Sequence, residues 1–536
     1  TGKTVGLFQI ESAGMREALI QMKPNHIEDI IALVALYRPG PMSNIPTYND
    51  CKHGKQKPDY LHPLLEDILK PTYGVIIYQE QVMQIAQKLS GFTAGQADLL
   101  RRAMGKKKRA ELEKQKQGFI AGAVKNGIAK DVAAGIFLKI EPFAEYGFNK
   151  SHAAAYAIIS YQTAFLKTYY PREFIAASMT MDISNQNKLS EFYEELKRLN
   201  VEVIRPDINE CFADFRTIND KFYYALGGIK AVGFDAISNI VEERTLNGKF
   251  DSISDFITRV NPKDINKLQL EGLVKAGAFD KLNANRQSLH ESIPAMITKN
   301  KNIFDNKTAN QIDLFSENES VEDDILIKTK EWEFEERLSK EFEAVGFFIS
   351  DHPLNQFTEI FNDYKIIDYS SFISQEDLMN SNIAATLLKV QERKTAKGNA
   401  YAVLKLTDLS SVFELFIFSD VLELNRDILK EGSSLILTLF KNVSNDENRL
   451  TRINVQKIAS IKDLFNSTIN EVSFDLKSKK QIEKISKILK DEGKTVVNIN
   501  LVTEENILKF RLKNARKLDR KSLNLLRNQE IQAIIN

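Results

Sequence analysis

The sequence YGFNKSHAAAY occupies residues 146–156 and marks the start of the longest helix that the sequence predicts. We expect this helix to cover residues 151–170, with Ser151 capping its first turn and Pro171 ending it. A helix N-terminus presents free N–H groups and the positive end of the dipole, which suit a phosphate. Further donors and positive charge come from Asn149, Lys150 and His152. An ordinary capped helix with a surface lysine explains the same residues.

A basic cluster lies upstream of this helix, in LLRRAMGKKK at residues 99–108. Gly105 is expected to break a short helix, which places two arginines on the helix and three lysines on the following turn: Arg101, Arg102, Lys106, Lys107 and Lys108. Residues 101–116 hold eight basic side chains and two acids. Such a cluster can neutralise a triphosphate or a nucleic-acid backbone. The alternative is a charged loop in solvent.

A third stretch, LYRPGP at residues 36–41, places a rigid Pro-Gly-Pro turn directly after a helix. The turn would hold Arg38 at a defined angle. A purely structural turn with an exposed arginine is the other interpretation.

Composition indicates a multidomain protein. The chain has 536 residues, enough for three to five domains. Its net charge is +1, but residues 317–343 contain eleven acids against four bases, which indicates an acidic connector beside a basic working surface. No apolar run is long enough to span a membrane. Cys51, Cys211 and the six histidines show no metal-ligand spacing, so we expect reduced thiols, no metal site and a cytoplasmic protein.

The order of patterns predicts an α+β architecture. Residues 1–200 read as helices, residues 201–225 as short strands, and residues 226–292 as short helices with glycine hairpins. Residues 300–345 read as a polar linker that leads into a helix. Alternating apolar residues then predict four strands within residues 382–455, which suggests a small barrel of the OB type. The last 70 or so residues mix helix and strand and are rich in lysine.

Five segments in this order resemble the fingers region of the alpha subunit of bacterial DNA polymerase III, a family C replicative polymerase: GLFQIESAGM at 6–15, ALYRPGP at 35–41, YQEQVM at 78–83, RRAMGKKK at 101–108 and YGFNKSHAAAY at 146–156. The resemblance covers almost the whole chain and weakens after about residue 465. It implies fingers at 1–200, a tandem helix-hairpin-helix domain at 201–292, an acidic linker at 293–345, a connector with an OB domain at 346–460, and a small mixed C-terminal domain, similar to a tau-binding domain, at 461–536.

The resemblance also implies roles for single residues. The nucleotide phosphates would be bound by Arg101, Arg102, Asn149, Lys150, Ser151 and His152, while the pocket or the template would be supported by Arg38, Lys106, Lys107 and Lys108. Two glycine hairpins would hold DNA phosphates without reading sequence, through Lys230, Gly233, Lys275 and Gly277. The first hairpin carries Ala231 where glycine is usual, which puts its grip in doubt, and either hairpin could be a plain packing unit.

The linker and the barrel carry the remaining implied contacts. Residues Gln311, Ile312, Asp313, Leu314 and Phe315 resemble the family's sliding-clamp-binding pentapeptide, although five-residue patterns also recur by chance. The barrel would bind single-stranded DNA through the charges of Arg393, Lys394 and Lys397 and through stacking on Tyr401, Phe413, Phe416 and Phe418. About half of these aromatic side chains must face the core instead, because strand side chains alternate.

The expected function is DNA-directed DNA polymerisation from deoxynucleoside triphosphates, with Mg²⁺ held by palm aspartates. No convincing carboxylate pair occurs here, since Asp323-Asp324 lies in the linker and Glu28-Asp29 on a helix. Thr1 is not a methionine, so we expect a piece of a longer protein that is inactive alone. Expected partners are primer–template DNA, a sliding clamp, the clamp-loader tau subunit and a proofreading exonuclease. The alternatives are a non-catalytic DNA-binding and clamp-docking module and an error-prone family C polymerase.

Overall fold

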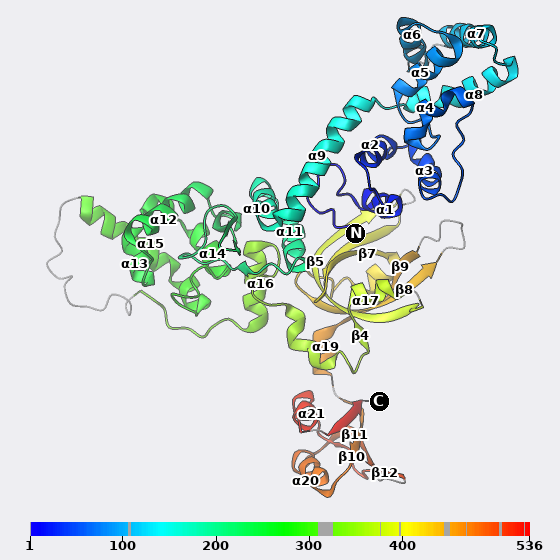
Figure 1. Ribbon diagram of the computed structural model, residues 1–536. Coiled ribbons are helices and arrows are strands. Elements are labelled where there is room, and N and C mark those ends of the chain that lie inside the picture. The colour runs from blue at the N-terminus through cyan, green and yellow to red at the C-terminus, as the bar shows by residue number, and fades with distance from the viewer. Residues whose placement is uncertain are drawn as a thin grey trace. The chain divides into compact units, whose positions relative to one another are not determined.

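The computed structural model describes residues 2–105, 109–308, 325–375, 377–395, 398–443, 451–467, 469–502, 506–529 and 531–535. The chain divides into two compact units, Thr1–Met181 and Asp182–Asn536 (Figure 1). The predicted end of the fingers, near residue 200, therefore falls inside the second unit. No helix in the described part of the chain is long and apolar enough to cross a membrane.

The first unit is helical, as predicted. Its helices are α1 (Ala13–Met22), α2 (Ile27–Leu36), α3 (Ile45–Lys52), α4 (Glu66–Leu69), α5 (Gln79–Ser90), α6 (Ala94–Gly105), α7 (Arg109–Lys125), α8 (Lys130–Tyr146), α9 (Lys150–Tyr169) and α10 (Pro171–Met181). Short 3-10 turns lie at Pro41–Asn44, Pro63–Leu65 and Lys70–Thr72. Pro171 was predicted to end the preceding helix, and α9 does stop just before it, at Tyr169. Pro171 also starts the next helix, because proline is well suited to the first helical position.

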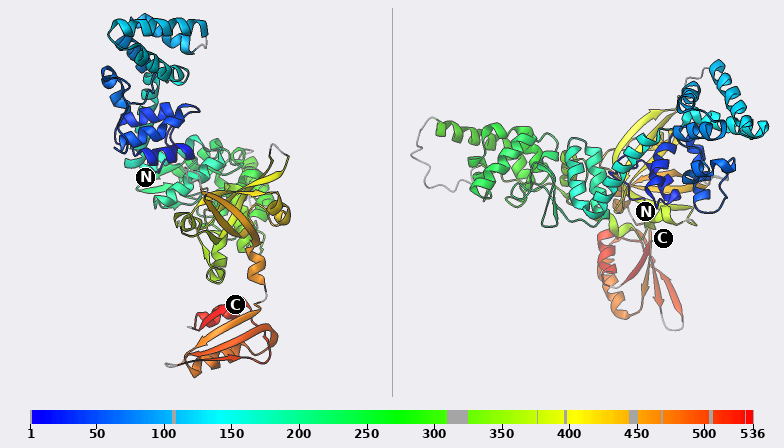
Figure 2. Two further views of the ribbon diagram at one scale, coloured as in Figure 1. Left: turned by 90° about the vertical axis from the view of Figure 1, so that its right-hand side faces the viewer. Right: turned by 45° about the horizontal axis from the view of Figure 1, so that its top comes forward.

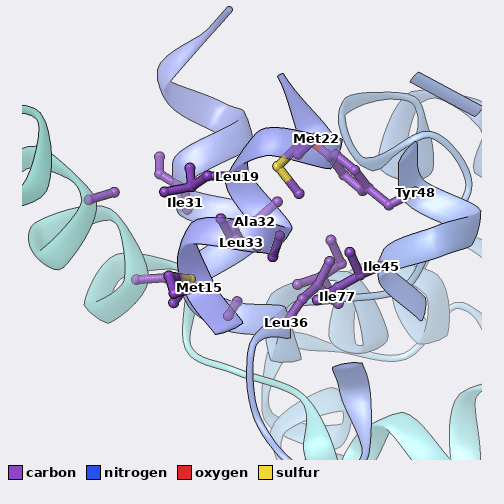
Figure 3. Packing of buried hydrophobic residues seen from close by; sticks show 14 of the residues in the cluster. Met15, Leu19, Met22, Ile31, Ala32, Leu33, Leu36, Ile45, Tyr48 and Ile77 are labelled. Atoms are coloured by element: carbon purple, nitrogen blue, oxygen red, sulfur yellow. The ribbon is translucent and has the colours of Figure 1, made fainter. Parts of the chain in front are cut away.

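Two apolar cores hold this unit together. The first lies between α1, α2, α3 and the start of α9, where Met22, Leu33 and Tyr48 are fully buried (Figure 3). A buried polar group pins α3 to α2 beside this core: the Asp29 carboxylate accepts hydrogen bonds from Tyr48 and Lys52 at 3.0 and 2.8 Å. The second core lies among α5, α6, α7 and α8 and includes the buried Phe119 and Phe137.

Helix α9 also fixes the beginning of the chain. The Lys167 ammonium donates to the backbone carbonyls of Lys3 and Val5 at 3.2 and 2.7 Å. The Ser160 hydroxyl donates to the Phe8 carbonyl at 2.9 Å. Residues 3–8 are therefore bound along the second half of α9, a helix that lies more than 140 residues downstream.

The second unit begins with α11 (Gln186–Arg198) and a sheet of order β1-β3-β2, formed by Val203–Ile204, Lys221–Tyr223 and Arg216–Ile218. The 3-10 turn η4 (Leu226–Gly228) is followed by α12 (Phe234–Asn247), α13 (Ile253–Arg259), η5 (Pro262–Asp264), α14 (Lys267–Lys275), α15 (Arg286–Thr308) and α16 (Phe334–Val345). This succession of short strands and short helices confirms the pattern predicted for residues 201–292.

The central sheet of the second unit has the strand order β7-β6-β5-β8-β9, with β4 (Ile366–Ile367) beside β5. Its strands are β5 (Asn380–Lys394), β6 (Ala400–Thr407), β7 (Val412–Phe418), β8 (Ser434–Val443) and β9 (Thr451–Ser460). The ladders of this path are antiparallel and include all four predicted strands. Over the residues that the structure describes, no ladder joins β7 to β9, so the sheet path stays open.

Three further helical segments accompany this sheet: η6 (Pro353–Ile360), α17 (Tyr369–Ser374) and α18 (Ser419–Asn425). A short helix, α19 (Ile461–Asn466), then leads to a small mixed part with sheet order β12-β11-β10-β13. The elements of this part are β10 (Glu471–Leu476), α20 (Lys479–Ile488), β11 (Glu492–Val502), β12 (Ile507–Arg511), α21 (Arg520–Arg527) and β13 (Gln532–Ile535). Figures 1 and 2 show α20 and α21 on one side of this sheet.

A half-buried histidine is expected to make the second unit sensitive to acid. His352 caps η6 by accepting a hydrogen bond from the Leu354 amide at 3.1 Å, and burial lowers the pKa of His352 to about 4. As the pH falls, His352 is therefore protonated in the unfolded chain at a higher pH than in the folded protein. The stability that neutral His352 contributes is complete above about pH 6.5 and is lost as the pH falls toward 4.

In the His352→Asn variant the carboxamide oxygen can still accept the Leu354 hydrogen bond. Between pH 7 and pH 4.5 we expect the free energy of unfolding to fall by about 2–3 kcal/mol less in this variant than in the wild type. Urea unfolding at the two pH values measures this difference. His62 makes the same hydrogen bond to Leu64 at a more exposed helix start, so His62→Asn is the matched control. Equal acid sensitivity of the wild type and His352→Asn would contradict the assignment.

Candidate nucleic-acid interface

The residues predicted to bind the nucleotide lie in the last turns of α6 and at the start of α9, close to the start of α5. An isolated parallel bridge joins Tyr78, just before α5, to Phe148, just before α9. The Gln79 amide donates to the Phe148 carbonyl at 3.0 Å, and the Gln79 side chain donates to the Gly147 carbonyl at 3.0 Å. The start of α5 therefore fixes the backbone that leads into α9.

The cap of α9 is Asn149, not Ser151, and this corrects the predicted helix start. The Asn149 side chain accepts from the His152 amide at 2.8 Å, while Ser151 lies exposed in the first turn. The Tyr78–Phe148 bridge keeps the chain extended as far as residue 148, so the helix begins as soon as that bridge ends. Asn is as good a cap as Ser, so propensity alone could not choose between them.

A carboxylate already occupies this helix start. Glu80 accepts from the Lys150 amide at 3.0 and 3.1 Å and from the Asn149 side chain at 3.0 Å. The Lys150 ammonium lies 5.4 Å from the centre of the Tyr78 ring. The structure therefore joins Asn149 and Lys150 to the first turn of α5 through Glu80.

Both arginines of the basic cluster lie on α6, as predicted. Arg101 and Arg102 share the carboxylate of Asp98, one turn earlier, at 2.7 and 2.8 Å. The hydrogen bond from Arg101 lowers the pKa of Asp98, so this carboxylate stays ionised at neutral pH. Arg101 also donates to the Gln79 side chain at 3.4 Å, which connects α6 to the start of α9. Lys106, Lys107 and Lys108 lie outside the described residues.

Arg38 belongs to the same neighbourhood. Its guanidinium stacks 4.2 Å from the centre of the Phe148 ring and donates to the Ala35 carbonyl at 3.1 Å. The His152 ring lies 5.3 Å from Phe148 and 4.6 Å from Tyr156. Sequence reasoning did not assign roles to Gln79, Glu80 or Asp98. The polar run after Tyr78, at the start of α5, was the available signal for Gln79 and Glu80.

The first predicted hairpin, residues 229–233, has an exposed turn. Ala231 has φ 62°, the left-handed conformation that glycine adopts without strain. Gly233 caps α12 and the cap makes no side-chain hydrogen bond. Lys230, Ala231 and Gly233 are all exposed. The alanine that put this hairpin in doubt therefore takes the backbone shape of a glycine.

The second predicted hairpin is more enclosed. Gly277 has φ 81° and is buried, and a Cβ built there would lie 2.2 Å from the Arg286 Nη2 atom. Only glycine therefore fits beneath this guanidinium. Lys275 is paired with Glu343 at 3.1 Å. Lys275 and Gly277 thus face neighbouring parts of the protein more than Lys230 and Gly233 do.

We expect Ala231→Gly to raise the free energy of unfolding of the second unit by about 0.5–1 kcal/mol. Relief of the left-handed alanine is worth about 1–2 kcal/mol, and the added flexibility of the unfolded chain costs about 0.5–1 kcal/mol. Urea unfolding tests this. Ala236→Gly, inside α12, is the control and should destabilise by about 0.5–1 kcal/mol. A loss of stability in both variants would show that Ala231 is not strained.

One face of the central sheet carries cations and aromatic rings. The register of β5, β6 and β7 aligns three rows of side chains across this face. The rows are Lys389–Lys405–Glu414, Gln391–Val403–Phe416 and Arg393–Tyr401–Phe418. An open groove of about 330 Å³ on this face is lined by Asn187, Lys389, Gln391, Arg393, Val403, Lys405, Glu414 and Phe416. Sequence reasoning missed Lys389 and Lys405, which the register brings to the same face.

The aromatic side chains divide as strand alternation predicts. Phe416 and Phe418 are 51% and 59% exposed. Phe413 lies in the core and stacks on Tyr369 with ring centres 3.8 Å apart. Partial burial lowers the pKa of Lys405. Lys394 is exposed at the end of β5, and Lys397 lies outside the described residues.

The pentapeptide Gln311, Ile312, Asp313, Leu314 and Phe315 lies outside the described residues. Within the described ranges, no group of three or more His, Cys, Asp or Glu side chains is placed to hold a metal ion.

Comparison with known proteins gives two family matches. Residues 1–127 match the bacterial DNA polymerase III alpha subunit finger domain, and residues 200–289 match a helix-hairpin-helix motif. Similar proteins named DNA polymerase III subunit alpha include those of Caulobacter vibrioides, 41% identical over 82% of this chain and 38% of the relative, and Borreliella burgdorferi, 39% identical over 88% and 41%. That of Chlamydia muridarum is 34% identical over 95% and 42%. The chain spans about two fifths of the length of these relatives.

Proposed function

We propose that this chain, which is homologous to the alpha subunit of bacterial DNA polymerase III over its finger domain and helix-hairpin-helix region, acts in replicative DNA synthesis. Its role is to bind the incoming deoxynucleoside triphosphate and the primer–template DNA during DNA-directed polymerisation. The observation that carries this proposal is the meeting of Arg101, Asn149 and Lys150 at the start of α5, inside the segment that resembles a polymerase finger domain or directly after it.

In this proposal the phosphates of the nucleotide are bound by Arg101, Arg102, Asn149, Lys150, Ser151 and His152. Two guanidinium groups and a helix N-terminus suit a triphosphate, because both interact with anions over short distances. Arg38 supports the pocket through Phe148, and Lys106–Lys108 extend its positive charge. Ser151 contributes from the first turn of α9, not as its cap.

The Mg²⁺ that the family uses does not fit the carboxylates of the described residues. Two-metal phosphoryl transfer needs carboxylates gathered around the ions, and Asp29, Glu80 and Asp98 are each bound to their own donors. We assign no catalytic or metal-binding residue in this chain and place Mg²⁺ in another part of the polymerase.

We further propose two DNA contacts. The hairpin at residues 229–233 binds duplex phosphates through its backbone and Lys230, with the hairpin at 273–279 in a supporting role. The face of β5, β6 and β7 binds single-stranded DNA as an OB-type module, with Arg393, Lys394 and Lys397 for charge and Phe416 and Phe418 for stacking. The groove on that face and the exposed rings support this assignment.

The protein partners are also proposals. Residues 311–315 bind a sliding clamp, residues 461–536 the clamp-loader tau subunit, and a proofreading exonuclease completes the assembly. Alanine at Gln311 and Phe315 should abolish clamp-stimulated synthesis and leave basal synthesis intact. Clamp binding by that variant would mean that the pentapeptide is coincidental.

The proposed DNA contact is tested by titrating fluorescent primer–template DNA with this chain between 50 and 200 mM salt. We expect affinity to fall with salt, with a log–log slope of about 0.9 for each phosphate neutralised. Lys230→Ala should weaken binding uniformly across sequences and reduce the slope by about one. Lys267→Ala, which removes an exposed lysine that faces Glu271, should change neither. Salt-independent binding, or equal effects of the two variants, would overturn the assignment of the hairpin.

A further inference from the structure

The groups proposed to bind the triphosphate are already paired with carboxylates of this chain. Asp98 accepts from Arg101 and Arg102 at 2.7 and 2.8 Å. Glu80 accepts from the Asn149 side chain and the Lys150 amide at 3.0 Å. Two separate anions, one on α6 and one on α5, therefore hold the two halves of the proposed phosphate site.

These carboxylates take up the interactions that a phosphate would use. A helix N-terminus offers only a few N–H groups, and Glu80 engages one of them together with the neighbouring carboxamide. A second anion brought to the same donors is repelled by the first. The same holds at α6, where the pKa of Asp98 is lowered, so its charge persists at neutral pH.

The two carboxylates are held in different ways. Glu80 follows Gln79, whose amide and side chain bind the Phe148 and Gly147 carbonyls, so its backbone is fixed beside α9. Asp98 lies on the same helix as its two partners and is 29% exposed, so rotation of its side chain alone releases both arginines. Each carboxylate can therefore leave by rotation of its side chain, Asp98 from partners on its own helix and Glu80 from partners at the start of α9.

We propose that Glu80 and Asp98 are internal competitors of the triphosphate, which keep the site self-paired until a nucleotide displaces them. This inference rests on the proposed nucleotide site. The affinity of the site is then a difference between two sets of ion contacts, so it is lower than the cationic groups alone would give. The same competition opposes any polyphosphate, including the pyrophosphate that the reaction releases.

The test uses the natural protein that contains these residues, with primer extension measured as KM and kcat for a deoxynucleoside triphosphate and as the inhibition constant of pyrophosphate. We expect Glu80→Gln and Asp98→Asn each to lower KM about two- to fivefold, the range of helix-terminus and exposed ion-pair effects. The inhibition constant of pyrophosphate should fall by a similar factor. Asp131→Asn, which removes an acid from the first turn of α8, is the matched control and should change neither.

Arg101→Ala separates this inference from the function on which it rests. An unchanged KM in Arg101→Ala would remove the nucleotide site itself. If Arg101→Ala raises KM while Glu80→Gln or Asp98→Asn leaves it unchanged or also raises it, the site stands and the competition is overturned. Thermal unfolding of each variant confirms that the compared proteins are folded.

Discussion

Arg286→Met should lower the free energy of unfolding of the second unit by about 3–5 kcal/mol, the usual cost of removing one partner from a buried ion pair. Arg286 is 6% exposed and donates to Asp280 at 2.6 and 2.8 Å and to the Lys275 carbonyl at 3.0 Å. It also lies 3.4 Å from Glu341, which is 1% exposed. Methionine fills the space above Gly277 but leaves the Glu341 charge buried without its cation.

Urea unfolding measures this loss through the transition midpoint and slope. Arg426→Met is the control, because Arg426 and Glu392 form an exposed pair worth less than about 1 kcal/mol. Adding Glu341→Gln to Arg286→Met should restore part of the stability, since a neutral carboxamide can still accept from the Ile349 and Ser350 amides that Glu341 binds. Equal losses in Arg286→Met and Arg426→Met would show that the buried pair is not important for stability.

The largest expected effect on binding comes from the double variant Phe416→Ala, Phe418→Ala. Stacking of a base on an aromatic ring is worth about 1–3 kcal/mol, so loss of both rings should weaken single-stranded DNA binding about 30-fold or more. Both rings are largely exposed on β7, so their removal should leave the core and the thermal unfolding temperature nearly unchanged. Lys389, Arg393 and Lys405 remain, and the salt dependence of binding should therefore persist.

Fluorescence anisotropy with an unstructured oligonucleotide measures this effect. Leu424→Ala on α18 removes another exposed apolar side chain and should leave affinity unchanged. Duplex binding through the hairpin at residues 229–233 should also survive in the double variant. Single-stranded affinity within about twofold of the wild type would mean that this face is not a stacking surface.

Local patterns predicted the elements well. The helix predicted over residues 151–170 is α9, Lys150–Tyr169, and the four strands predicted within residues 382–455 are β5, β6, β7 and β8. Alternation predicted that about half of the aromatic side chains face the core, and β7 buries Phe413 while Phe416 and Phe418 stay exposed. These signals need no knowledge of the rest of the chain.

Features set by distant residues could not be predicted. Glu80 meets Lys150 across 70 positions in sequence, and Arg286 meets Glu341 across 55. The cap of α9 depends on a bridge between Tyr78 and Phe148, not on the preference of Ser151 for caps. Ala231 adopts a glycine conformation because the surrounding hairpin imposes it, and no propensity for alanine indicates that. The candidate site was therefore predicted as a set of residues, while its internal pairings required the fold.

The attachment of residues 3–8 to α9 makes that helix a mechanical link. A helix of 20 residues is roughly 30 Å long and bends little. The first turn of α9 is bound by Glu80, and Ser160 in its middle and Lys167 near its end bind residues 3–8. A tilt of the rod when an anion replaces Glu80 would therefore move residues 3–8, and the hydrogen bond from Arg16 to the Thr4 hydroxyl would carry that movement to α1.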